Sequence, residues 1–146
     1  MSNFETRIPY DQLGLEGSVP AGSSWNVYGR DDQLGSVGLL TPERVLSGVA
    51  LVSKGAVFSL NWSLDLPNPA LFGRRNMQHT INFDSSGTDD MYEGFFPQCS
   101  SQWDSLSHIR HPVHGFYQGF QEHDITGLPG TRLGICLLYT SDAADE

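Results

Sequence analysis

The sequence predicts a mixed α/β fold, in which a mixed sheet carries flanking helices. Three observations support this class. A helix signature occupies residues 41–55, an alternating apolar segment follows it directly at 58–64, and a second alternating segment lies at 79–83. Alternation with a period of two is typical of strands with one buried face. We expect the sheet to be incomplete at its C-terminal end.

The helix is predicted from its start and stop signals. Thr41 suits the N-cap and Pro42 the first helical position, while Lys54 and Gly55 are typical of a helix end. We expect three turns whose apolar face packs against the sheet. Four residues make up that face: Val45, Leu46, Val49 and Val52.

The strands are predicted in the half of the chain that follows. The first covers 58–64 and stops before Pro67, and the second covers 79–83. Residues 84–90 are rich in turn formers. A third strand is a candidate at 93–96.

The two ends of the chain differ from its centre. Residues 1–23 mix charges, glycine and proline without a period, and predict an irregular arm. Residues 136–146 match an in-frame translation of a sequencing adaptor, which indicates a non-native tail. The alternative is a natural strand from Leu133 to Tyr139 followed by an acidic tail. On the adaptor interpretation, 24–135 is the N-terminal part of a longer domain, and this piece alone should be unstable and inactive.

The composition excludes several classes of function. The chain has 146 residues, a hydrophobic fraction of 38% and a formal net charge of -9. Eight basic residues cannot supply the phosphate contacts that nucleic-acid binding needs. No apolar run approaches the ~18 residues of a membrane span, and the start lacks a signal peptide. We therefore expect no membrane partner and a cytoplasmic location. Cys99 and Cys136 are too few for a disulfide framework.

Histidines are concentrated near one end of the chain. Four of the five lie within sixteen residues: His108, His111, His114 and His123. Such a cluster is typical of a metal or acid–base site, and it also fits a polar loop. Pro112 and Gly115 break any helix that would align the last three, so the loop is favoured for these.

Asp104 and His108 form a separate candidate pair. They lie four residues apart, and a helix starting at Trp103 would place both on one face. The spacing fits a catalytic pair, and it equally fits a surface ion pair or a helix cap.

The segments around this pair resemble a known family. The run Ser101-Gln-Trp-Asp-Ser-Leu-Ser-His108, followed by Gly115-Phe-Tyr-Gln-Gly119, is similar to the cyclase family that includes bacterial kynurenine formamidase and isatin hydrolase, in its Gln-Trp-Asp branch. Four upstream motifs follow the same branch in the same order: Trp25 with Gly29-Arg-Asp-Asp-Gln-Leu-Gly35, Leu39-Leu-Thr-Pro-Glu-Arg44, 55–60 and 74–79. The resemblance covers 24–135 and implies a swivelling β/β/α fold.

The family's metal signature is retained only in part. It contains two metal-binding histidines, a metal-binding aspartate and a final histidine for acid–base chemistry. These positions are occupied here by Gln98, Gln102, Asp104 and His108. The resemblance therefore implies Asp104 and Gln102 as ligands of a divalent ion, Zn or Mn, and His108 as the catalytic residue. Amide oxygens are weaker ligands than imidazoles, so the metal should be bound less tightly.

The resemblance implies a metal-dependent, arylformamidase-like hydrolase. Its substrates would be aryl formamides, as in tryptophan catabolism, other small amides, or cyclic amides and lactones. The ion would activate a water, His108 would carry its proton, and Trp103 would either wall an aromatic pocket or be a core residue. The alternatives are a metal-free small-molecule-binding protein on the same scaffold and a structural domain. A homo-oligomer is an open possibility.

Overall fold

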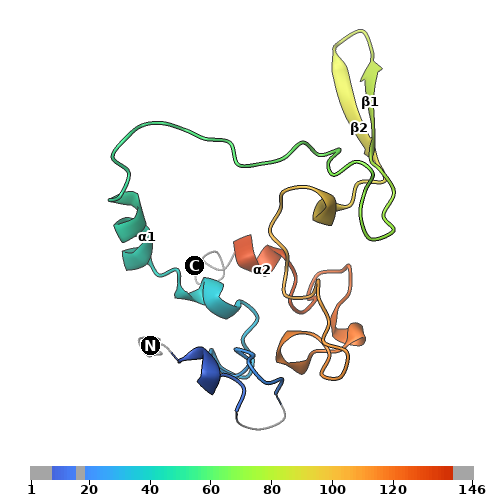
Figure 1. Ribbon diagram of the computed structural model, residues 1–146. Coiled ribbons are helices and arrows are strands. Elements are labelled where there is room, and N and C mark those ends of the chain that lie inside the picture. Colours follow the sequence, from blue (N-terminus) through green and yellow to red (C-terminus); the bar gives the residue numbers. More distant parts are fainter. Residues whose placement is uncertain (1–7, 16–18, 140–146) are drawn as a thin grey trace. The chain divides into compact units, whose positions relative to one another are not determined.

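The computed structural model describes residues 8–15 and 19–139, whose regular structure is sparse (Figure 1). These residues form two helices, α1 (Pro42–Val49) and α2 (Cys136–Tyr139), and one sheet of β1 (Gln78–Phe83) and β2 (Thr88–Glu93). The chain divides into two units. The first combines residues up to Lys54 with those from Asp104 onward, and the second spans Gly55–Trp103.

The predicted helix is confirmed as α1, but it is shorter than expected. It starts where Thr41 Oγ1 accepts a hydrogen bond from the Arg44 backbone N–H at 3.4 Å. It ends at Val49, because Leu51 and Val52 donate to carbonyls three residues back and tighten the chain out of the helix. Its predicted apolar face is not buried. All four of its residues are more than half exposed: Val45, Leu46, Val49 and Val52.

The strand predicted at 58–64 is wrong for the structure described here. Residues 55–63 form no regular structure, and Phe58 and Leu60 are 79% and 91% exposed. A strand needs a neighbour that takes up its backbone hydrogen bonds. The described residues supply only side chains at one end, where Ser101 Oγ accepts from the Trp62 N–H at 2.8 Å.

The second predicted strand is confirmed as β1. It pairs antiparallel with β2, and His79 lies opposite Tyr92. The turn is shorter than the predicted 84–90, since Asp84 Oδ1 accepts from the backbone N–H of Gly87 at 2.9 Å and β2 starts directly afterwards. The third candidate, 93–96, is wrong beyond Glu93, where β2 ends.

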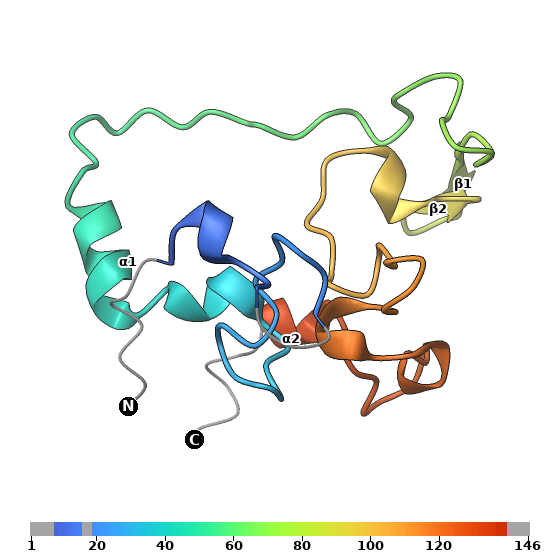
Figure 2. The same cartoon turned by 60° about the horizontal axis from the view of Figure 1, so that its bottom comes forward.

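The first unit is held together by two segments that lie side by side in Figures 1 and 2, residues 19–40 in blue and 104–139 in orange and red. The Tyr117 hydroxyl donates to Asp32 Oδ2 at 2.6 Å, and the same carboxylate accepts the N–H groups of Leu34 and Gly35. Leu133 is 1% exposed, and its N–H donates to Gln33 Oε1 at 2.9 Å. These contacts join the motif at 29–35 to the C-terminal part of the unit.

Gln118 makes a second connection between these segments. Its Oε1 accepts from the Asn26 N–H at 3.2 Å, and its Nε2 donates to the Gly29 carbonyl at 2.7 Å. Gln118 adopts a positive φ of 59°. The motif at 115–119 therefore has a structural task, because it fixes the loop directly after Trp25.

The strand considered for Leu133 to Tyr139 is wrong, because Cys136–Tyr139 forms α2. The remaining tail, 140–146, and residues 1–7 and 16–18 of the arm lie outside the described residues. The division into arm, domain part and tail stays a prediction. None of the helices within the described ranges has the length and apolar character needed to cross a bilayer.

Candidate functional site

A cavity of about 530 Å³ in the first unit brings the predicted pair together. Asp104 and His108 both line it. Much of the remaining wall is apolar or aromatic, with Pro20, Trp25, Leu106, Ile109, Pro112 and Tyr117. The volume lies within the roughly 300 to 1,000 Å³ typical of small-molecule sites.

The helix predicted to align the pair is wrong. Residues 102–105 have no regular structure, and a turn follows in which the His108 N–H donates to the Ser105 carbonyl at 3.1 Å. The hydroxyls of Ser105 and Ser107 lie 2.6 Å apart and bond to each other. Serine favours such local bonds over a helix interior. A turn therefore places Asp104 and His108 at the cavity, with Asp104 exposed and His108 half-buried.

Trp25 and Tyr117 form the aromatic part of the wall. Their rings meet edge to face, with centroids 6.3 Å apart and planes at 83°. Burial raises the pKa of Tyr117 well above its ordinary value, and the hydrogen bond to the Asp32 carboxylate raises it further. The tyrosine hydroxyl thus stays protonated at neutral pH and acts as the donor to Asp32.

The other histidines behave as the loop interpretation predicts. His111 lies in a tight turn closed by Gly115, and its Nδ1 accepts the N–H groups of Val113 and His114 at 3.2 Å. His114 packs against Trp25 with ring centroids 6.2 Å apart. His123 is exposed and lies outside the cavity. His111 also lines the cavity, which the loop interpretation did not anticipate.

Gln98, Gln102 and Trp103 belong to the second unit. Gln102 and Trp103 are exposed, and neither lines the cavity of Asp104 and His108. The Gln98 carbonyl accepts from Arg74 Nη1 at 3.3 Å. Trp103 is 68% exposed, so the alternative that made it a core residue is wrong. The aromatic part of the cavity wall is formed by Trp25 and Tyr117, and the ligand role of Gln102 stays a prediction.

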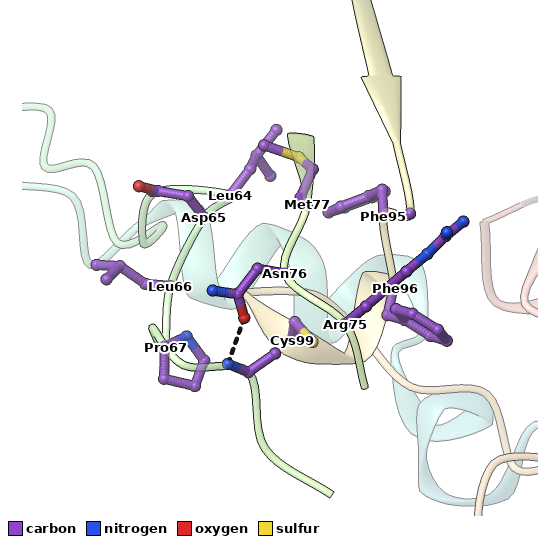
Figure 3. A pocket seen from close by; sticks show the side chains of 12 residues that line it. Leu64, Asp65, Leu66, Pro67, Arg75, Asn76, Met77, Phe95, Phe96 and Cys99 are labelled. Atoms are coloured by element: carbon purple, nitrogen blue, oxygen red, sulfur yellow. Dashed lines mark hydrogen bonds between the residues drawn. The ribbon is translucent and has the colours of Figure 1, made fainter. Parts of the chain in front are cut away.

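The second unit has a cavity of about 310 Å³ beside His79 and Tyr92. Another cavity of this unit is far smaller, with a volume of about 10 Å³ (Figure 3). Asn76 closes it by accepting from the Ala70 N–H at 2.7 Å and donating to Asn68. Arg75 lies against Gly94, where an added Cβ would be 2.6 Å from Arg75 Nε. The space holds about one water, so this cavity cannot take a substrate.

The described residues do not complete a metal site. Among 8–15 and 19–139, no group of three or more histidine, cysteine, aspartate or glutamate side chains could hold a metal ion. Asp104 and His108 offer one carboxylate and one imidazole, whereas a catalytic zinc takes three protein ligands. The described residues alone therefore offer too few donors for a resident metal.

Comparison with solved structures relates this chain to a cyclase. A crystal structure described as that of a novel cyclase superimposes with a TM-score of 0.65 at 29% sequence identity over 77% of this chain. The resemblance to the cyclase family is confirmed. The chain spans 42% of the length of that cyclase. No family model and no curated protein matches.

The cyclase fold places in one unit several residues whose importance the sequence did not reveal. Trp25, Asp32 and Tyr117 all stood in motifs similar to the cyclases, but their roles were not assigned. The signal that could have pointed to Asp32 and Tyr117 is their place in the motifs at 29–35 and 115–119, because these two segments contact each other.

Proposed function

We propose that this chain contributes the acid–base residues of a cyclase-family hydrolase that acts on small amides, aryl formamides, or cyclic amides and lactones. The observation that carries the proposal is the shared cavity, in which Asp104 and His108 meet an apolar and aromatic wall. Such a combination suits a small substrate with one reactive carbonyl.

His108 is the proposed proton carrier. An imidazole titrates near neutral pH, so it can accept a proton from a water that adds to the substrate carbonyl. It then returns the proton to the nitrogen, or to the ring oxygen of a lactone, as the bond from the carbonyl carbon breaks. Asp104 lines the same cavity and would place a carboxylate beside the substrate.

The proposed hydrolase would bind a divalent ion, Zn or Mn, with Asp104 and Gln102 as the ligands from this chain. Since the described residues do not complete a metal site, no reaction step is assigned to the ion. A second candidate is a metal-free small-molecule-binding protein. Gln98 and Gln102 stand where the family's signature has metal-binding histidines, which favours it.

The test uses the protein encoded by the longer reading frame that contains residues 1–135, assayed with formanilide. Asp104→Asn and His108→Ala should each lower kcat by roughly 10² to 10⁴, the usual contribution of an acid–base group. His123→Ala is the matched control, because this exposed imidazole lies outside the cavity.

Metal analysis of the same protein separates the two candidates. Near-stoichiometric Mn or Zn together with turnover supports the hydrolase. Formanilide binding without turnover, and without metal after reconstitution, supports the binding protein. Wild-type rates in both the Asp104 and His108 variants would contradict the proposed roles.

A further inference from the structure

We infer that Trp25 and Ser23 form a ligand subsite in the cavity, which takes a planar ring against Trp25 and a hydrogen-bonding group of the same ligand at Ser23. The inference rests on the proposed function, and it deepens that function by naming residues that select the substrate. Both residues line the cavity that holds Asp104 and His108.

Trp25 is held in place from several sides. Tyr117 and His114 pack edge to face against the indole, both at 83°. Gln118 fixes the loop directly after it through Asn26 and Gly29. An aromatic side chain that is already ordered loses little entropy when a ligand ring packs on it. Trp25 is therefore suited to select flat rings over saturated ones.

Ser23 carries the independent observation. Its hydroxyl is buried and is the one buried side-chain polar atom without a hydrogen-bond partner in the described part of the chain. Its backbone is fixed, because the Ser23 N–H donates to the Pro20 carbonyl at 3.1 Å. A buried hydroxyl without a partner destabilises the folded state. Ser23 also lines the cavity, so a rotation of its side chain toward the cavity would let a ligand group supply the missing partner, since a hydroxyl both donates and accepts.

The remaining wall limits the ligand to one polar group near this end. Pro20 lies beside Ser23 and Trp25, and Leu106, Ile109 and Pro112 add further apolar surface. A charged group packed against these apolar side chains would lose its hydration, and Arg110, which also lines the cavity, is already paired with Glu122. The ligand class that fits is a neutral planar ring with one hydrogen-bonding substituent.

Titration of the full 146-residue chain with two size-matched probes tests the subsite. Formanilide has a planar ring, and N-cyclohexylformamide has a saturated one. Dissociation constants are measured by NMR. We expect formanilide to bind about threefold to tenfold more tightly, the range for an aromatic contact.

Trp25→Leu should remove this preference, and Trp25→Phe should keep most of it. Trp62→Leu is the matched control, since Trp62 is 57% exposed and lies in the other unit. Equal binding of the two probes, binding of neither, or an unchanged preference in Trp25→Leu would overturn the ring subsite.

Ser23→Ala separates a ligand role from a structural one. The variant should bind formanilide about threefold to tenfold more weakly, the equivalent of one lost hydrogen bond. At the same time its thermal midpoint without ligand should be equal or higher, because the unpartnered hydroxyl is gone. Unchanged affinity, or a lower midpoint, would overturn the role of Ser23.

These binding results are independent of turnover. A ring preference that depends on Trp25, combined with wild-type hydrolysis in His108→Ala, would leave the subsite in place and reject the proposed catalysis. Equal binding of the two probes by the unmodified chain, combined with slow hydrolysis in His108→Ala, would reject the subsite and leave the hydrolase intact.

Discussion

Two regions of this chain reach opposite states of burial. Where residues 25–35 meet 117–133, Leu133 is 1% exposed and Tyr117 is 9% exposed. Between residues 45 and 64, Val57 and Leu60 are 95% and 91% exposed. In the first region each segment supplies the other with hydrogen-bond partners as well as apolar contacts, as Tyr117 with Asp32 and Leu133 with Gln33 show. The comparison teaches that an apolar period in the sequence fixes neither an element nor its burial by itself, because both depend on a second segment that supplies contacts.

The largest difference between the regions should appear on truncating a leucine. Leu133→Ala should lower the free energy of unfolding by about 2 to 5 kcal/mol, the usual cost of removing a buried leucine side chain. Leu60→Ala is the matched control and should change it by less than about 0.5 kcal/mol. Urea unfolding measures both. Similar losses in the two variants would show that the exposed region is packed.

The next effect concerns the Tyr117–Asp32 hydrogen bond. Tyr117→Phe should lower the free energy of unfolding by about 1.5 to 3 kcal/mol at pH 7, as expected for the loss of a hydrogen bond to a charged group. Because the folded-state pKa of Tyr117 is raised, this stabilisation is fully present below the ordinary tyrosine pKa of about 10. It is lost as pH rises further, through the raised folded-state value.

Urea midpoints of both proteins across pH 7 to 11 check this expectation. The difference between the urea midpoints of wild type and Tyr117→Phe should be constant up to about pH 9. It should then narrow, since the tyrosine of the unfolded chain ionises near pH 10. In a protein that already carries Asp32→Asn, the change Tyr117→Phe should shift the urea midpoint much less. A difference between wild type and Tyr117→Phe that widens with pH would contradict the assigned donor.

The smallest effect on stability is expected in the exposed segment. Phe58→Ser and Leu60→Ser should leave the free energy of unfolding within about 0.5 kcal/mol. They should lower self-association, because an exposed alternating segment is a site for strand pairing between chains. Sedimentation over a range of concentrations measures this, with Ser59→Ala as the control. Unchanged association in both variants would show that these side chains do not attract other copies.

Local signals accounted for the elements that the sequence predicted correctly. The hydroxyl of Thr41 caps α1, and alternation at 79–83 marks β1. The same alternation at 58–64 failed because a strand needs hydrogen bonds from a neighbour, which no local pattern supplies. A turn closed by the His108 N–H and the Ser105 carbonyl stands in place of the helix expected after Trp103.

The candidate site was predictable only in part. The sequence pointed to Asp104 and His108 as a pair, and the structure places both at one cavity, although by a turn. It could not point to Trp25, because the position of that ring depends on residues about ninety positions away, such as Gln118. It could not point to Ser23 either, since a missing partner is visible only in three dimensions.

Chemical-shift mapping of the chain with formanilide tests the central claim most directly. Backbone amide shifts are recorded by NMR during the titration, together with the imidazole signals of His108. The account predicts the largest shifts at residues 20–25 and 104–117, including Ser23, Trp25 and His108, and none above background at 55–64. Shifts confined to 55–64, or none at all, would contradict the claim that this cavity is the functional site.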